Sequence, residues 1–126
     1  MTWRWIEKRA LILLPNESLA EHGGSSGLRD EGLLESGLSQ PQNLAAYGSP
    51  DHADLAAAYG YGLAKNHPFV DGNKRAVFLA VGVFLAFGWR LAASQAEATI
   101  AMLALAAGEL DAAAFAEWIR RHNARR

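Results

Sequence analysis

The sequence has no cysteine, almost no excess of charge of either sign and no hydrophobic run of membrane length. Without cysteine there can be neither a disulfide framework nor a thiolate zinc site, so any metal ion must be held by oxygen or histidine ligands. Twelve basic and thirteen acidic residues leave a net charge of −1, which provides no general attraction to nucleic acid or to an anionic membrane. We therefore expect a cytoplasmic protein that does not bind DNA directly.

The most apolar stretch, residues 76–87, is about twelve residues long and contains Gly82. A bilayer-spanning helix needs roughly 20 apolar residues, so we expect a core helix here and no membrane contact. The stretch is apolar on every side, which is typical of a buried central helix enclosed by its neighbours. A length of 126 residues suits one domain, which we expect to comprise residues 1–126.

Helical signals dominate the rest of the chain. Alanine is frequent and β-branched residues are sparse in the C-terminal half, which favours an all-α fold. Apolar spacing predicts helices over 6–22, with a kink at Pro15, and over 30–38, 50–66 and 73–87. Pro68 should end the helix over 50–66 at residue 66 or 67. Further helices are expected from the capping box of Ser94 and Glu97 to Gly108, and after the cap Asp111. In the helix over 50–66 Ser49 is the expected N-cap, and Leu55, Tyr59 and Leu63 are the expected inward stripe.

Glycine and proline are concentrated in the segment 23–50, which holds eight of these residues. We expect this segment to be mostly exposed loop, apart from the short helix over 30–38. The basic C-terminal end, residues 120–126, suits the negative end of a helix dipole and so does not by itself indicate a nucleic-acid site.

The chemistry concentrates in nine consecutive residues, His67-Pro68-Phe69-Val70-Asp71-Gly72-Asn73-Lys74-Arg75. They place an imidazole, a carboxylate, a carboxamide, an ammonium and a guanidinium around one glycine and a predicted helix start. The first amides of a helix lack intrahelical acceptors and lie at the positive end of its dipole, so they form an anion site. Gly72 permits close approach of a phosphate to this backbone. The pattern predicts a phosphate-handling active site.

Each reactive side chain suits one role in phosphate chemistry. Lys74 and Arg75 lie in the first turn, where cations are unfavourable unless an anion is bound nearby. Asp71 could hold a Mg²⁺ ion that bridges phosphates. His67 could accept a proton from an attacking hydroxyl, because an imidazole is a partly neutral base near pH 7. With no cysteine, and no serine in the motif, direct transfer from a nucleotide is favoured over a covalent enzyme intermediate.

Each of these residues also has an ordinary structural explanation when it is taken alone. Asp71 and Asn73 are common helix caps, Phe69 is typical of a core, and a single histidine is usually a surface residue. It is their joint occurrence with two first-turn cations that favours an active site over a structural turn.

The nine residues match the signature His-Pro-Phe-x-(Asp/Glu)-Gly-Asn-(Gly/Lys)-Arg, and the chain therefore resembles the Fic/Doc superfamily. Upstream, residues 21–36 and Pro41-Gln42-Asn43 are similar to the first-helix end and the variable flap of death-on-curing (Doc) proteins. The resemblance implies a compact Fic-fold helical bundle in which the motif loop leads into the central helix.

Lys74 stands where adenylyl-transferring Fic enzymes have glycine, and it resembles the choice in Doc toxins. The resemblance then implies a toxin of a toxin–antitoxin system that uses ATP and Mg²⁺ to phosphorylate a protein hydroxyl, a threonine of elongation factor Tu, and so arrests translation. The roles it implies are general base for His67, metal ligand for Asp71, and phosphate or nucleotide binding for Gly72, Asn73, Lys74 and Arg75. Two alternatives stay open: transfer of AMP by the same residues, and a catalytically silent module that binds an antitoxin.

The sequence departs from the family pattern at two places and lacks one regulatory feature. Pro15-Asn16-Glu17 replaces a common His-Asp-Glu near the end of the first helix, and Ala76 replaces a common threonine, which leaves the substrate range open. Self-inhibited relatives pair a helix glutamate with a second arginine, whose position here is Phe78. Restraint is therefore expected from a separate Phd-type antitoxin, whose C-terminal segment would fold into a groove on the toxin.

Overall fold

The computed structural model describes residues 3–10, 29–68, 73–86 and 88–125, with the side chains of residues 73 and 74 excepted. The elements are α2 (Glu31–Tyr47), α3 (His52–Asn66), α4 (Asn73–Leu85), β1 (Trp89–Leu91), α5 (Gln95–Ala106), α6 (Ala112–His122) and β2 (Asn123–Arg125). Residues 8–10 are also helical, but residues 6 and 7 are not, so the predicted start of the 6–22 helix is wrong; residues 11–22, with the predicted kink at Pro15, lie outside the described residues. The predicted all-α class is confirmed, with one small sheet added.

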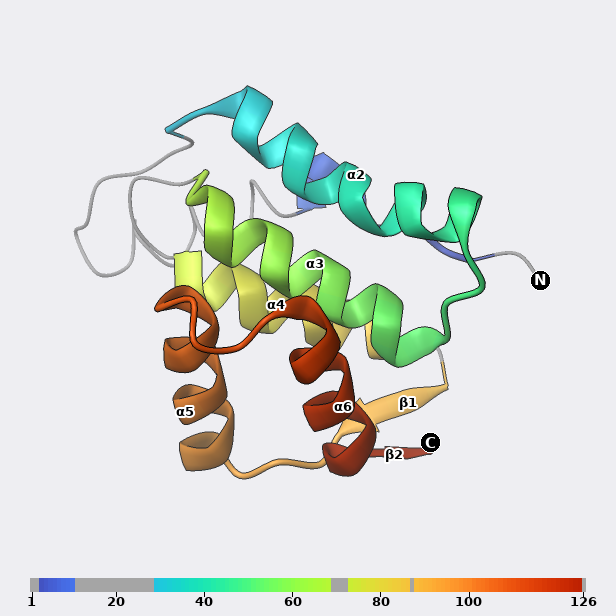
Figure 1. Cartoon of the computed structure of the whole chain (residues 1–126), viewed down its shortest axis with the longest axis vertical. Coiled ribbons are helices and arrows are strands. Elements are labelled where there is room, and N and C mark those ends of the chain that lie inside the picture. Colours follow the sequence, from blue (N-terminus) through green and yellow to red (C-terminus); the bar gives the residue numbers. More distant parts are fainter. Residues whose placement is uncertain (1–2, 11–28, 69–72, 87, 126) are drawn as a thin grey trace.

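Helix α3 is the centre of the bundle. It packs against α2, α4, α5 and α6, and Figure 1 shows it passing between α2 on one side and α5 and α6 on the other. Ten of its 15 residues are buried. The predicted inward stripe is confirmed, because Leu55, Tyr59 and Leu63 have no exposed surface.

Glycines in α3 allow its neighbours to approach closely. A Cβ added to Gly62 would lie 3.0 Å from the carbonyl oxygen and 3.1 Å from the Cα of Gly37, so the backbones of α2 and α3 touch there. A Cβ added to Gly60 would lie 2.6 Å from Cε2 of Phe115 in α6. Neither position accepts a side chain unless its neighbour moves, and this explains why the central helix is rich in small residues.

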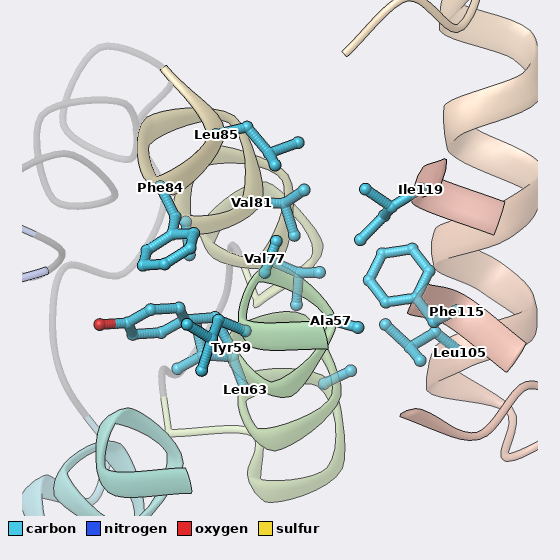
Figure 2. Packing of buried hydrophobic residues seen from close by; sticks show 14 of the residues in the cluster. Ala57, Tyr59, Leu63, Val77, Val81, Phe84, Leu85, Leu105, Phe115 and Ile119 are labelled. Carbon is cyan, nitrogen blue, oxygen red and sulfur yellow. The ribbon is translucent and has the colours of Figure 1, made fainter. Parts of the chain in front are cut away.

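Helix α4 is buried on one face, so the prediction that it is enclosed on every side is wrong. Phe78 is 44% exposed and Val83 is 41% exposed. The inner face contributes a row of buried side chains to the core: Ala76, Val77, Ala80, Val81, Phe84 and Leu85. Figure 2 shows Val77, Val81, Phe84 and Leu85 of this row with Tyr59 and Leu63 of α3 and Phe115 and Ile119 of α6. Apolar composition alone does not reveal whether a partner element covers the outer face.

Helix α2 is longer than the sequence predicts, so residues 39–47, an expected loop, are helix. The helix continues past Pro41 to Tyr47. An interior proline removes one backbone hydrogen bond, but Pro41 is buried here together with Leu34 and Leu38. The free energy gained by burying this face of α2 against α3 outweighs the loss of one backbone hydrogen bond. The glycine and proline content of the segment does not reveal this burial. Residues 23–28 of the expected flap lie outside the described residues.

The helix caps follow the predictions with one exception. Ser94 and Glu97 form the predicted capping box of α5, and Asp111 caps α6 by accepting a bond from the backbone N–H of Ala114 at 2.8 Å. Gly108, predicted to end α5, has a φ of 79°. The cap of α3 is Asp51, which forms a capping box with Asp54, so the prediction of Ser49 is wrong. The carboxylates at 51 and 54 complete a reciprocal pair of backbone bonds that Ser49 cannot make.

The C-terminal end is attached to the bundle by contacts that the sequence pattern does not reveal. Strands β1 and β2 pair antiparallel, with Arg90 opposite Ala124. Three-residue strands are too short to show a period-two pattern. The Arg120 guanidinium forms ion pairs with the carboxylates of Asp51 (Nε to Oδ2, 2.9 Å) and Asp54 (Nη2 to Oδ1, 2.6 Å). These ion pairs connect α6 to the start of α3.

The ion pair between Arg120 and Asp51 also makes the stability of the contact between α6 and α3 depend on pH. Hydrogen bonding from Arg120 lowers the pKa of Asp51 from 3.8 to about 2. A carboxyl group whose pKa is lowered on folding stabilises the fold above its unfolded pKa, and this contribution is lost as the pH falls toward 2. The side chain of Asp51 is 46% exposed, so solvent reduces the size of the effect.

No helix within the described ranges has both the length and the apolarity that crossing a bilayer requires.

Candidate active site

His67 is the residue at which α3 ends, as the sequence predicts for a position next to Pro68. Its side chain is exposed, and its backbone N–H donates to the carbonyl oxygen of Leu63 at 3.2 Å. Its backbone lies in the left-handed region, with φ 47° and ψ 58°. Residues other than glycine rarely adopt this conformation, and a following proline restricts the choice further. His67 therefore stores backbone strain that its surroundings must hold.

The turn at His67 is held by hydrogen bonds from Arg29 and Asp30, which lie just before α2. The Arg29 guanidinium donates to the carbonyl oxygen of His67 from Nε at 2.9 Å and from Nη2 at 2.6 Å, and Nη2 also donates to the carbonyl oxygen of Asn66 at 3.1 Å. The backbone N–H groups of Arg29 and Asp30 donate to the carbonyl oxygen of Pro68 at 2.7 and 3.0 Å. Three consecutive carbonyl groups at the end of α3 are thus bonded to two residues of another segment.

Helix α4 begins at Asn73, which confirms the predicted start. Asn73, Lys74 and Arg75 form its first turn, and the side chain of Arg75 is exposed. In Figure 1 the end of α3 and the start of α4 lie on the same side of the bundle. The first amides of a helix have no acceptor in an earlier turn and lie at the positive end of its dipole, so the start of α4 is a place where an anion can bind. The structure therefore brings the backbone of His67 and a cationic helix start to one end of two packed helices.

Several predicted site residues lie outside the described parts of the chain. They are Asp71 and Gly72, together with the side chains of Asn73 and Lys74. Elsewhere in the described structure His, Asp and Glu side chains form no group of three that could hold a metal ion. A carboxylate together with phosphate oxygens is a donor set that suits Mg²⁺, so the residue types of the motif fit this ion.

A hollow of about 430 Å³ lies beside Arg75, between α4 and α5. Its lining is mainly apolar and includes, among the described residues, Arg75, Phe78, Leu79, Gln95, Thr99 and Met102. The prediction missed both this hollow and Arg29. The spacing of Gln95, Thr99 and Met102 places them on one face of α5, but only the packing of α5 on α4 shows that this face adjoins the motif.

Two comparisons with known proteins bear on this site. The model of the Fic/DOC family matches residues 5–85, which include the whole motif. Toxin Doc of Mycolicibacterium smegmatis is 44% identical over 66 residues, which cover 50% of this chain and 50% of that protein. The match thus spans half the length of this curated relative.

Proposed function

This chain belongs to the Fic/DOC family, and we propose that it is the toxin of a toxin–antitoxin system and transfers the terminal phosphate of ATP to a protein hydroxyl. The observation that carries the proposal is the placement of His67 at the end of α3, on the same side of the bundle as the start of α4 with its cation Arg75. The likeness to a curated Doc toxin and the lysine at position 74 favour phosphate over AMP as the transferred group.

In the proposed reaction the imidazole of His67 accepts the proton of the acceptor hydroxyl. The hydroxyl oxygen then forms a bond to the terminal phosphorus of ATP, the bond from that phosphorus to the bridging oxygen breaks, and ADP leaves. Lys74, Arg75 and the amides of Gly72 and Asn73 bind the phosphates and stabilise the charge that develops on them. Bound Mg²⁺, with Asp71 as its protein ligand, would neutralise phosphate charge.

The proposed acceptor is a threonine of elongation factor Tu, and its modification would arrest translation. The resemblance of the motif to that of Doc toxins supports this choice. The same residues could transfer AMP if ATP were bound in the opposite direction, so the position of the label on the product decides between the two reactions.

We predict that the label of [γ-³²P]ATP, and not that of [α-³²P]ATP, is transferred to the acceptor. The protein is incubated with each nucleotide, Mg²⁺ and purified elongation factor Tu, and the mass of the modified peptide is measured. Chelation of Mg²⁺ by EDTA is expected to stop the transfer. Label from the α position would show adenylyl transfer instead, and absence of both labels from elongation factor Tu would exclude it as the acceptor.

We also propose that a Phd-type antitoxin covers the outer apolar surface of α4 and α5. Phe78 lines the hollow beside Arg75 and is 44% exposed, and Leu103 on α5 is 46% exposed. Thr99 lines the same hollow, and Leu103, one helical turn further along, shares its side of α5. Exposed apolar side chains that border a concave surface are typical of a protein interface. A segment bound there would also restrict access to Arg75.

The change Leu103→Glu is expected to weaken the complex with the antitoxin about 10- to 100-fold, because a carboxylate would be desolvated in an apolar contact. Titration calorimetry with the purified antitoxin measures the change. Tyr47→Glu is the matched control, since Tyr47 is an apolar residue on α2 that is 90% exposed and lies outside this surface. If the two variants bound the antitoxin with equal affinity, the antitoxin would bind a surface other than that of α4 and α5.

A further inference from the structure

Arg29 lies outside the nine-residue motif, yet its side chain is bonded to the residue proposed as the base. Its guanidinium donates to the carbonyl oxygens of Asn66 and His67, which are 37 and 38 positions away in the sequence. The last carbonyl groups of a helix have no intrahelical donors and carry the negative end of the helix dipole. A guanidinium fits this place, because it offers several donors in a fixed plane together with a positive charge.

The segment that carries Arg29 is itself held in place by both its backbone and its neighbours. Asp30 caps α2 by accepting a bond from the backbone N–H of Leu33 at 3.0 Å. The side chain of Asn66 in turn donates to the carbonyl oxygen of Leu33 at 3.0 Å. Hydrogen bonds therefore run from the start of α2 to the end of α3 and from the end of α3 back to α2. These bonds fix the position of Arg29 relative to His67.

The left-handed backbone of His67 gives these bonds a specific consequence. A non-glycine residue in this region persists only where several contacts hold it. At His67 the N–H is bonded to Leu63, the carbonyl oxygen is bonded to Arg29, and the next carbonyl oxygen is bonded to the backbone of Arg29 and Asp30. The backbone conformation of His67 sets the direction of its Cα–Cβ bond, and this direction determines where the imidazole can lie.

We infer that Arg29 is a positioning residue: it holds the backbone of His67 in the left-handed conformation and so directs the imidazole toward the start of α4. The inference rests on the proposed function, in which that imidazole takes the proton of the acceptor. Arg29 binds carbonyl groups and need not touch ATP. Its loss should therefore slow the chemical step and leave nucleotide binding unchanged.

The test compares Arg29→Ala, Arg29→Lys and the control Lys8→Ala. Lys8 is also a cation bonded to α2, through Glu31 at 2.6 Å and Glu35 at 2.8 Å, but its bonds do not reach α3. Arg29→Ala is expected to lower kcat for phosphate transfer about 10- to 100-fold and to change KM for ATP by less than about twofold. Arg29→Lys should recover part of kcat, since an ammonium keeps the charge but lacks the planar fork. Lys8→Ala should have the same kcat and the same KM for ATP as the unchanged protein.

A second measurement does not depend on activity. Hydrogen exchange of the His67 amide, followed by NMR, should become about tenfold faster in Arg29→Ala and stay unchanged in Lys8→Ala. Unchanged exchange at His67 would overturn the inference even if the protein transferred no phosphate. An unchanged kcat in Arg29→Ala, with activity abolished in His67→Ala, would overturn it too. A rise in KM for ATP equal to the fall in kcat would assign Arg29 to substrate binding instead and would likewise overturn it.

Discussion

Replacing His67 by alanine is expected to reduce phosphate transfer about 10²- to 10⁴-fold, the range associated with loss of a general base. Toxicity on expression should disappear with it. The side chain of His67 is exposed, so its removal leaves no cavity in the core. Circular dichroism and thermal melting should therefore match those of the unchanged protein, while the labelled-ATP assay shows the loss.

His52→Ala is the matched control, since it is the same change at the opposite end of the same helix. The His52 ring stacks on Trp89 with centroids 4.0 Å apart and bonds to Asn123 at 2.7 Å. This variant should melt at a lower temperature and still transfer phosphate. A His67→Ala protein that stayed fully toxic would favour the silent antitoxin-binding module and contradict the proposed reaction.

Replacing Phe115 by alanine is expected to lower the free energy of unfolding by about 3–5 kcal/mol, as for other large buried aromatic residues. Phe115 is fully buried, lies directly over Gly60 of α3 and has its ring 5.9 Å from that of Trp118. Its removal would leave a cavity between α3 and α6 that helices held by their other contacts cannot close. Urea denaturation followed by tryptophan fluorescence measures the change.

Ile100→Ala provides the comparison for this stability prediction. Ile100 is 68% exposed on α5, so its truncation should change the free energy of unfolding by no more than about 0.5 kcal/mol. If the two variants unfolded at similar urea concentrations, the contact of Phe115 with α3 would not be the main connection between α6 and the central helix.

The helices that the sequence predicts well are those with strong local signals at both ends. Helix α5 follows the N-cap Ser94, which forms a capping box with Glu97, and α6 follows the N-cap Asp111, as predicted. The break at His67 followed from Pro68, because a proline restricts the residue before it. Such signals act over a few residues, so the sequence is sufficient to read them.

Apart from the start of the first predicted helix and the N-cap of α3, where Asp51 replaces the predicted Ser49, the predictions that failed concern contacts between distant segments. Helix α2 continues through Pro41 because it packs on α3 at Gly37 and Gly62, and no local signal reports this packing. The centre of the bundle is α3 rather than the uniformly apolar α4. Small residues allow more neighbours to approach α3, whereas part of α4 remains exposed.

By itself the sequence determined which groups are available at the candidate site: nine consecutive residues carry an imidazole, a carboxylate, two cations and a predicted helix start. Only the tertiary structure decided what supports and borders that site. Arg29 reaches His67 across 38 positions, and the hollow beside Arg75 exists only because α5 packs on α4. The physical reason is that local propensities act within a helical turn, whereas burial and hydrogen bonding between helices depend on how the whole chain folds.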